Sequence, residues 1–307
     1  MGIFGRIDTF ITWFDGVVWG LPLIILILVT GIFLTVRLGL LQVRYLGKAL
    51  KFMVKNEEDG HGEVTSFGAL CTALSATIGT GNIVGVATAI SAGGPGALFW
   101  MILTAFLGMA TKYSEGLLAV KYRTIDEDGH VLGGPLYYIE NGMGVKFRWL
   151  AKIFAFFGAG VGLFGIGTFT QVNSIASAVK NFFDPDMAHT ISLFGGNYSW
   201  ATVIAGLFLT VCVGLVVLGG IQRIAKVSEV IVPFMAILYF VVVIILILCN
   251  ITALPAAIKT IVIAAFTPKA VTGGAVGSML VAMQKGVARG IFSNEAGLGS
   301  APIAAAA

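Results

Sequence analysis

Long runs of apolar residues, separated by short polar connectors, dominate the chain. A hydrocarbon core of about 30 Å takes about 20 helical residues to cross, and runs of this length recur along the sequence. Because the runs lack the alternating pattern of a membrane barrel, each one predicts a transmembrane helix. The predicted spans are Val17–Val36, Val64–Ser91, Ala97–Tyr122, Trp149–Phe182, Trp200–Ile221, Val227–Asn250 and Thr272–Ile303.

Two connectors carry apolar residues without being full spans. Residues 37–63 are basic, with apolar positions at helical spacing, which predicts a segment lying in the membrane interface. Residues 252–268 are apolar but short and contain Lys259, which favours a re-entrant or interfacial helix. If this second segment crossed the membrane, the orientation of every later span would be reversed.

Composition and charge agree with a membrane protein. Only 11% of the 307 residues are charged and the mean hydropathy is +0.95, whereas a soluble domain carries about 25% charged residues. The net charge of +4 reflects connector residues and implies no nucleic acid: eleven Lys and Arg side chains lie in connectors on one side and four on the other. The positive-inside rule then places the N-terminus outside. Cys71, Cys212 and Cys249 are predicted to be small buried apolar groups.

The second span contains an unusual polar interruption, "SATIGTGN", at residues 75–82. Gly79 and Gly81 flank Thr80, and each glycine lowers helix propensity by about 1 kcal/mol. An unwound segment would present free amides to a carboxylate and free carbonyls to Na⁺ or an ammonium group, which together suit an amino-acid zwitterion. The alternative is that Gly79, Gly81 and Gly85 form a close-packing helix face.

The last span carries a similar interruption, "SNEAGLG", at residues 293–299, on a helix that runs the opposite way. Paired interruptions of this kind indicate the binding site of an alternating-access transporter. Glu295 is either a coupling charge or a structural partner for Arg289 or Lys285. On the third span, Lys112 and Glu115 are predicted to form a structural ion pair.

Three segments resemble the alanine or glycine:cation symporter family: "GGPGALFWMILTAFLG", "SATIGTGNIVGVATAI" and "RGIFSNEAGLGSAP". The first has Ile102 where the family usually has a second tryptophan. The resemblance implies an all-α polytopic membrane protein with a five-plus-five inverted repeat, like the leucine transporters. One extra helix (17–36) and the interfacial segment (37–63) would precede the first repeat (64–250) and the start of the second (251–307). Family members continue for about four more helices, so the remainder is expected to be missing.

The resemblance also implies a set of site residues. Gly79, Thr80 and Gly81 match the unwound loop that meets the substrate carboxylate, and Gln171 lies on a helix that lines the substrate pocket. Ser293, Asn294 and Gly297 match the second unwound region. The expected Na⁺ ligands are the side chains of Thr77 and Asn82 and the carbonyls of Ser75 and Ile78.

The implied function is import of L-alanine coupled to Na⁺ across the cytoplasmic membrane, with glycine and D-alanine as further candidate substrates. A proton-coupled symporter that uses Glu295, or a channel, is the alternative. An enzyme is not expected, because no nucleophile is paired with a base in a known catalytic motif. Lipids are the other expected partners, and the oligomeric state stays open.

Overall fold

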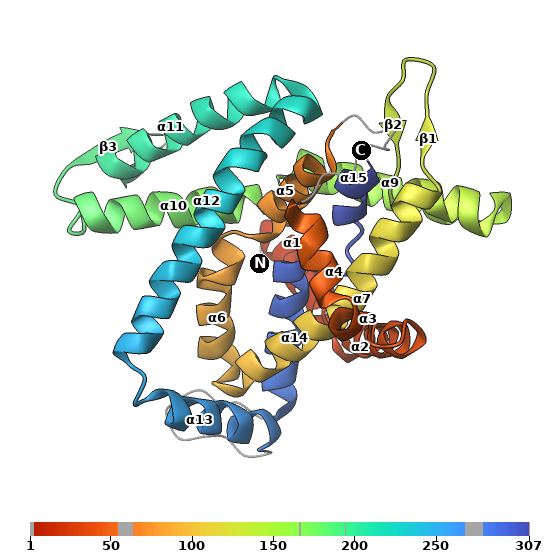
Figure 1. The fold of residues 1–307 in the computed structure, drawn as a ribbon. Coiled ribbons are helices and arrows are strands. Elements are labelled where there is room, and N and C mark those ends of the chain that lie inside the picture. The colour runs from red at the N-terminus through yellow and green to blue at the C-terminus, as the bar shows by residue number, and fades with distance from the viewer. Residues whose placement is uncertain (1–2, 55–63, 166, 194, 268–278, 307) are drawn as a thin grey trace.

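The computed structural model describes residues 3–54, 64–165, 167–193, 195–267 and 279–306, and helices dominate it (Figure 1). Within these residues, five helices are long and apolar enough to cross a membrane, or six if one bent pair counts as a span. The prediction of a helical, multi-pass chain is confirmed at this level. Of the seventh predicted span, residues 272–278 lie outside the described part.

The N-terminal region holds two consecutive helices where one was predicted. Helix α1 covers Ile3–Val18 and α2 covers Leu21–Arg37, with Pro22 in the first turn of α2. Proline is favoured there because its missing N–H has no helical partner in the first turn. The predicted interfacial segment contains α3 (Leu41–Arg44) and α4 (Leu46–Val54). Its residues 55–63 lie outside the described chain.

The predicted second span is a broken helix. Helix α5 (Ser66–Thr77) is followed by the short 3₁₀ helix η1 (Thr80–Asn82) and by α6 (Val84–Gly93), and the chain bends by 56° at the break. Helix α7 then runs without a break over Gly96–Lys121.

The predicted fourth span, Trp149–Phe182, lies within one apolar stretch long enough to cross a membrane, Val145–Phe183, but this stretch is not one continuous helix. The segment divides into α9 (Arg148–Leu163) and α10 (Thr168–Phe183). Gly165 and Gly167 take φ values of 60° and 94° between the two helices, a left-handed backbone that ends a helix and that glycine adopts without steric cost.

Small elements occupy the connectors. The connector after α7 holds an antiparallel hairpin of β1 (Thr124–Ile125) and β2 (Val131–Leu132), then α8 (Pro135–Tyr137), η2 (Tyr138–Met143) and η3 (Val145–Phe147). A second antiparallel hairpin, β3 (Thr190–Leu193) with β4 (Gly196–Ser199), joins α10 to α11. The all-α prediction missed both hairpins because neither strand pair is long enough to produce a pattern.

The later helices are α11 (Trp200–Val217), α12 (Gly220–Cys249), α13 (Leu254–Phe266), α14 (Met279–Asn294) and α15 (Ala301–Ala306). Helix α12 begins seven residues before the predicted Val227, so Arg223 lies in its first turns and donates to the Leu215 carbonyl at the end of α11. Helix α13 has 13 residues, about 20 Å, which is shorter than the hydrocarbon core.

Helices α7 and α14 pack closely and run in the same direction. A Cβ added at Gly286 would lie 2.3 Å from the Ala97 carbonyl oxygen, and one added at Gly108 would lie 3.0 Å from the Ala296 Cβ. Helix α6 runs antiparallel to α14, since Gly93 lies beside Ala282 while Asn82 contacts Ser293. Glycine therefore brings the two broken spans and α7 into one closely packed group.

Most large apolar side chains point outwards, as expected of helices that face lipid. The buried core centres on Ile24, Val287 and Ile291. The prediction that all three cysteines are buried is wrong for two of them: Cys71 is buried, but Cys212 and Cys249 are exposed. An apolar helix face in a membrane protein needs no protein cover, so an apolar neighbourhood in the sequence does not imply burial.

Candidate functional site

The first interruption follows Thr77, at the end of α5. The side-chain amide of Asn82 donates to the Thr77 carbonyl (2.6 Å), and the backbone N–H of Asn82 donates to the Gly79 carbonyl (3.1 Å). A neutral amide thus closes the break by satisfying one carbonyl that the helix has released.

Other backbone groups at this interruption have no hydrogen-bond partner among the described residues. Within the described residues, the amides of Gly79, Thr80 and Gly81 donate no hydrogen bond, and the carbonyls of Ser75 and Ile78 accept none. The segment is only half-buried. Three adjacent donors suit an anion such as a carboxylate, and the two carbonyl oxygens suit a small hard cation.

The second interruption begins after Asn294, so Ser293 and Asn294 form the last turn of α14 instead of lying in the unwound segment. Three residues of the loop before α15 are left-handed: Glu295 (φ 54°), Gly297 (φ 85°) and Gly299 (φ 77°). A left-handed backbone at a residue other than glycine costs about 1 kcal/mol. The geometry of this loop therefore needs support from elsewhere in the protein.

The two interruptions lie side by side. The Ser293 hydroxyl donates to the side-chain oxygen of Asn82. A Cβ added at Gly81 would lie 4.0 Å from the Cα and the hydroxyl oxygen of Ser293. Two predicted substrate residues and one predicted Na⁺ ligand therefore meet at a single point. The sequence alone could not predict this contact, because Ser293 and Asn82 are more than 200 positions apart.

Gln171, in the first turn of α10, reaches the same place. A Cβ at Gly79 would lie 3.3 Å from the Gln171 side-chain nitrogen, so the amide rests directly against the Gly79 backbone. This position agrees with its predicted place at the substrate pocket. Asn173, two residues further on, is exposed.

Lys112 and Glu115 do not form the predicted ion pair. The Lys112 amine donates to the Asn294 carbonyl (2.8 Å), and the Glu115 carboxylate accepts from the Gly297 amide (3.3 Å). The spacing on one helix favoured a pair, but a carbonyl at the end of α14 and an amide of the loop after it lie opposite and bind the two charges instead. Near Glu115, burial and then its negative charge raise the pKa of Tyr138 to about 12, so this phenol stays protonated.

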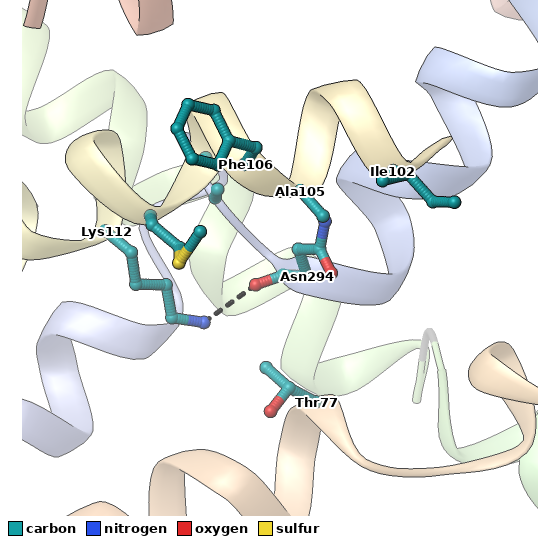
Figure 2. A pocket seen from close by; sticks show the side chains of 9 residues that line it. Thr77, Ile102, Ala105, Phe106, Lys112 and Asn294 are labelled. Carbon is teal, nitrogen blue, oxygen red and sulfur yellow. Dashed lines mark hydrogen bonds between the residues drawn. The ribbon is translucent and has the colours of Figure 1, made fainter. Parts of the chain in front are cut away.

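A cavity of about 480 Å³ opens between α5, α7 and the end of α14. Figure 2 shows Lys112 reaching from α7 towards Asn294, with Thr77 at the end of α5 across the gap. Much of the wall is apolar and includes Ile102, Phe106 and Met109. Ile102 is the position that departs from the family's usual tryptophan.

Glu295 binds neither of its predicted structural partners. Its carboxylate accepts from the Ser300 hydroxyl (2.9 Å), which closes the loop locally, and its charge lies close enough to act on Lys112. Arg289 and Lys285 are both exposed on α14. Glu295 therefore has a structural partner in Ser300, but not the partners that the sequence predicted.

The family model described as the sodium:alanine symporter family matches residues 5–307, which is nearly the whole chain and includes both interruptions. The chain belongs to the sodium:alanine symporter family. It is 48% identical over 296 residues to the sodium/alanine symporter AgcS of Methanococcus maripaludis, an alignment that covers 94% of this chain and 61% of AgcS. The prediction of a transporter family, and not an enzyme family, is confirmed.

Other relatives of the symporter family are similar over the same region. An uncharacterized transporter of Haemophilus influenzae is 55% identical over 302 residues, 98% of this chain and 62% of the relative. YrbD of Bacillus subtilis, whose name refers to sodium/proton-dependent alanine carriage, is 41% identical over 298 residues, 97% of this chain and 57% of YrbD. The chain thus spans about three-fifths of the length of these curated relatives.

Proposed function

We propose that the protein is a secondary transporter of the cytoplasmic membrane that imports L-alanine together with Na⁺. Glycine and D-alanine are proposed as further substrates. Inward movement of one positive charge contributes about 2.3 kcal/mol per 100 mV, and the Na⁺ gradient adds to this. Because cation and carboxylate would stabilise each other in one site, each would raise the affinity for the other.

One observation carries this proposal. Two antiparallel broken helices place their interruptions side by side, and the first interruption has both backbone N–H groups and backbone carbonyls without hydrogen-bond partners in the described part of the chain. The free amides of Gly79, Thr80 and Gly81 provide for the substrate carboxylate, beside Gln171. Ser293 and Asn294 would complete the pocket from α14. The amide of Gly297, also proposed as a substrate group, already donates to Glu115, so it would act through the position of the loop.

The residues at the first interruption fit a monovalent cation. The Ser75 and Ile78 carbonyls are free to ligate, and the Thr77 hydroxyl donates within its own helix, which leaves its oxygen lone pairs available. The Asn82 oxygen accepts from Ser293, so the proposed ligand also links both broken helices. Neutral oxygen ligands are the kind that broken transporter helices offer to Na⁺.

The antiparallel pair of broken helices also supports a five-plus-five inverted repeat. In this proposal the extra helix predicted at residues 17–36 corresponds to α2, residues 64–250 form the first repeat and residues 251–307 the start of the second, with the N-terminus outside. Transport would proceed by alternating access: loaded or empty protein changes face, whereas half-loaded protein does not.

Uptake of radiolabelled alanine into proteoliposomes containing the full-length protein tests the proposal. With an inward Na⁺ gradient, alanine should accumulate above equilibrium and saturate with concentration, and glycine and D-alanine should compete. A choline gradient should support neither. Uptake that is equal with choline contradicts Na⁺ coupling, and flux that does not saturate points to a channel.

Proton coupling through Glu295 is the alternative, suggested by a carboxylate placed at the second interruption. Glu295→Gln keeps an oxygen that can accept from Ser300 and removes only the titratable charge. Under Na⁺ coupling this variant should accumulate alanine like the wild type and show the same dependence on pH. The exposed connector residue Glu127 gives the matched control, Glu127→Gln. Loss of accumulation in Glu295→Gln alone would favour the proton carrier.

A further inference from the structure

Two charged side chains in the C-terminal half of the membrane helix α7 take no direct part in the proposed binding of Na⁺ or alanine. Lys112 and Glu115 are one turn apart and half-buried, and they form no salt bridge with each other. Charges at this depth are expensive unless they are paired or hydrogen-bonded. Their presence in a membrane helix therefore suggests a function that neutral side chains cannot supply.

Both charges bind the backbone on either side of the second interruption. The Lys112 amine takes the Asn294 carbonyl at the C-terminal end of α14, where the helix dipole is negative. The Glu115 carboxylate takes the Gly297 amide inside the loop. Each charge thus has the sign that its backbone partner prefers, and the two contacts bracket the left-handed residue Glu295.

The same peptide segment contacts the first interruption. Asn294 is held by Lys112 on one side, while the adjacent Ser293 donates to Asn82 on the other. Asn82 in turn closes the first interruption on Thr77. A connected series of hydrogen bonds therefore leads from α7 to the proposed Na⁺ ligands, and Lys112 itself faces Thr77 across the cavity (Figure 2).

From this geometry we infer that Lys112 and Glu115 are positioning residues: they hold the second interruption in place and thereby set the Na⁺ affinity of the first, without touching the substrate. The inference rests on the proposed Na⁺-coupled function for its effect on affinity. The holding of the loop itself is independent of that function.

Two variants of the full-length protein test the effect on affinity. Lys112→Met keeps the apolar stem and removes the donor, and it should raise the half-saturating Na⁺ concentration for alanine uptake about tenfold, since a hydrogen bond to a charged group is lost. Lys112→Arg keeps a donor and should restore most of the affinity. The KM for alanine at saturating Na⁺ should change less than the half-saturating Na⁺ concentration, since Lys112 reaches the proposed substrate pocket indirectly, through Asn294. Lys121→Met, an exposed lysine at the end of the same helix, is the matched control.

Hydrogen exchange on ligand-free protein tests the holding of the loop directly. Amides of residues 295–299 should exchange about tenfold faster in Lys112→Met and in Glu115→Ala than in the wild type or Lys121→Met. If exchange is unchanged, the inference is wrong, whatever uptake shows. A further outcome is that the wild type takes up alanine with Na⁺, while the variants exchange faster and yet keep the wild-type half-saturating Na⁺ concentration. In that case the coupling to the first interruption is wrong.

A wild type that takes up alanine without Na⁺ would refute the proposed function and the affinity effect together. The exchange result would still decide whether Lys112 and Glu115 hold the loop. The failure of either idea can thus be recognised separately.

Discussion

The two interrupted helices lie against each other but satisfy their backbone groups by different means. The first, between α5 and α6, is closed by the neutral side chain of Asn82 and leaves amides and carbonyls unbonded. The second, between α14 and α15, is held by the charges of Lys112 and Glu115 from another helix. In low-dielectric surroundings, hydrogen bonds to fixed charges are strong, so backbone groups that make them are not free to bind a ligand. This difference agrees with the proposal that alanine and Na⁺ bind mainly at the first interruption and that the second one supports it.

The largest expected effect concerns the support. Gly299→Ala would put a Cβ 2.7 Å from Phe154 and 2.9 Å from Pro135 at a residue with φ 77°. We expect a loss of about 2–4 kcal/mol in the free energy of unfolding, seen as a lower melting temperature in detergent.

The matched control for that glycine is Gly297→Ala, where φ is 85° but no atom lies within 4 Å of the added Cβ. Only the backbone strain remains there, about 1 kcal/mol. Equal melting temperatures for the two variants would contradict close packing around the second interruption.

The next effect concerns the neutral interruption. Asn82→Ala removes the donor to Thr77 and the acceptor of Ser293, two contacts of about 1 kcal/mol each. We expect Na⁺-driven alanine uptake to fall by more than about tenfold, with a smaller change in melting temperature than in Gly299→Ala. Uptake at the wild-type level would remove the first interruption from the binding site and break the comparison.

Gln171 lies against Gly79 of the first interruption, and its removal should give a smaller, more selective effect. Gln171→Ala should raise the KM for alanine about fivefold, as expected for one lost hydrogen bond, without altering stability. Asn173→Ala, an exposed amide on the same helix, should behave as the wild type. A similar KM for both variants would place Gln171 outside the substrate pocket.

The smallest effect extends the comparison to a carboxylate outside the spans. Asp184 accepts from the Ser199 hydroxyl (2.5 Å) and from the Ala188 amide (2.8 Å). The hydrogen bond from Ser199, followed by those from the backbone, lowers the pKa of Asp184 below its usual value.

A lowered pKa in the folded state gives stability that is present above the unfolded-state pKa and is lost as the pH falls through the folded-state pKa. Asp184→Asn should therefore lower the melting temperature at neutral pH, and the difference from the wild type should shrink in acid. A difference that is independent of pH would contradict this account.

Local sequence was sufficient for much of the helical pattern and for both interruptions. Two glycines around Thr80, and Gly297 and Gly299 after Asn294, lower helix propensity within apolar runs, and the chain leaves the helix at each place. The same reasoning did not predict the interruption at Gly165 and Gly167, which lies inside the predicted fourth span. Propensity alone does not tell a glycine that packs within a helix from one that ends it.

The partners of polar groups were less predictable. Lys112 and Glu115 three residues apart suggested a pair, and Glu295 suggested Arg289 or Lys285, because a helix places such residues on neighbouring turns. Each charge instead binds the group opposite it in the fold. A signal in one sequence could not have named Asn294 as the partner of Lys112, since 182 residues separate them.

The sequence by itself determined the membrane class, the positions of most helices and the two places where they break, because hydrophobicity and glycine propensity act over a few turns. Only the tertiary structure decided that the two breaks meet at Asn82 and Ser293, that Gln171 rests on Gly79, and that α7 supplies the charges for the second break. These outcomes depend on which helix faces which, and that is set by close packing of distant glycines and by the need to satisfy every buried polar group.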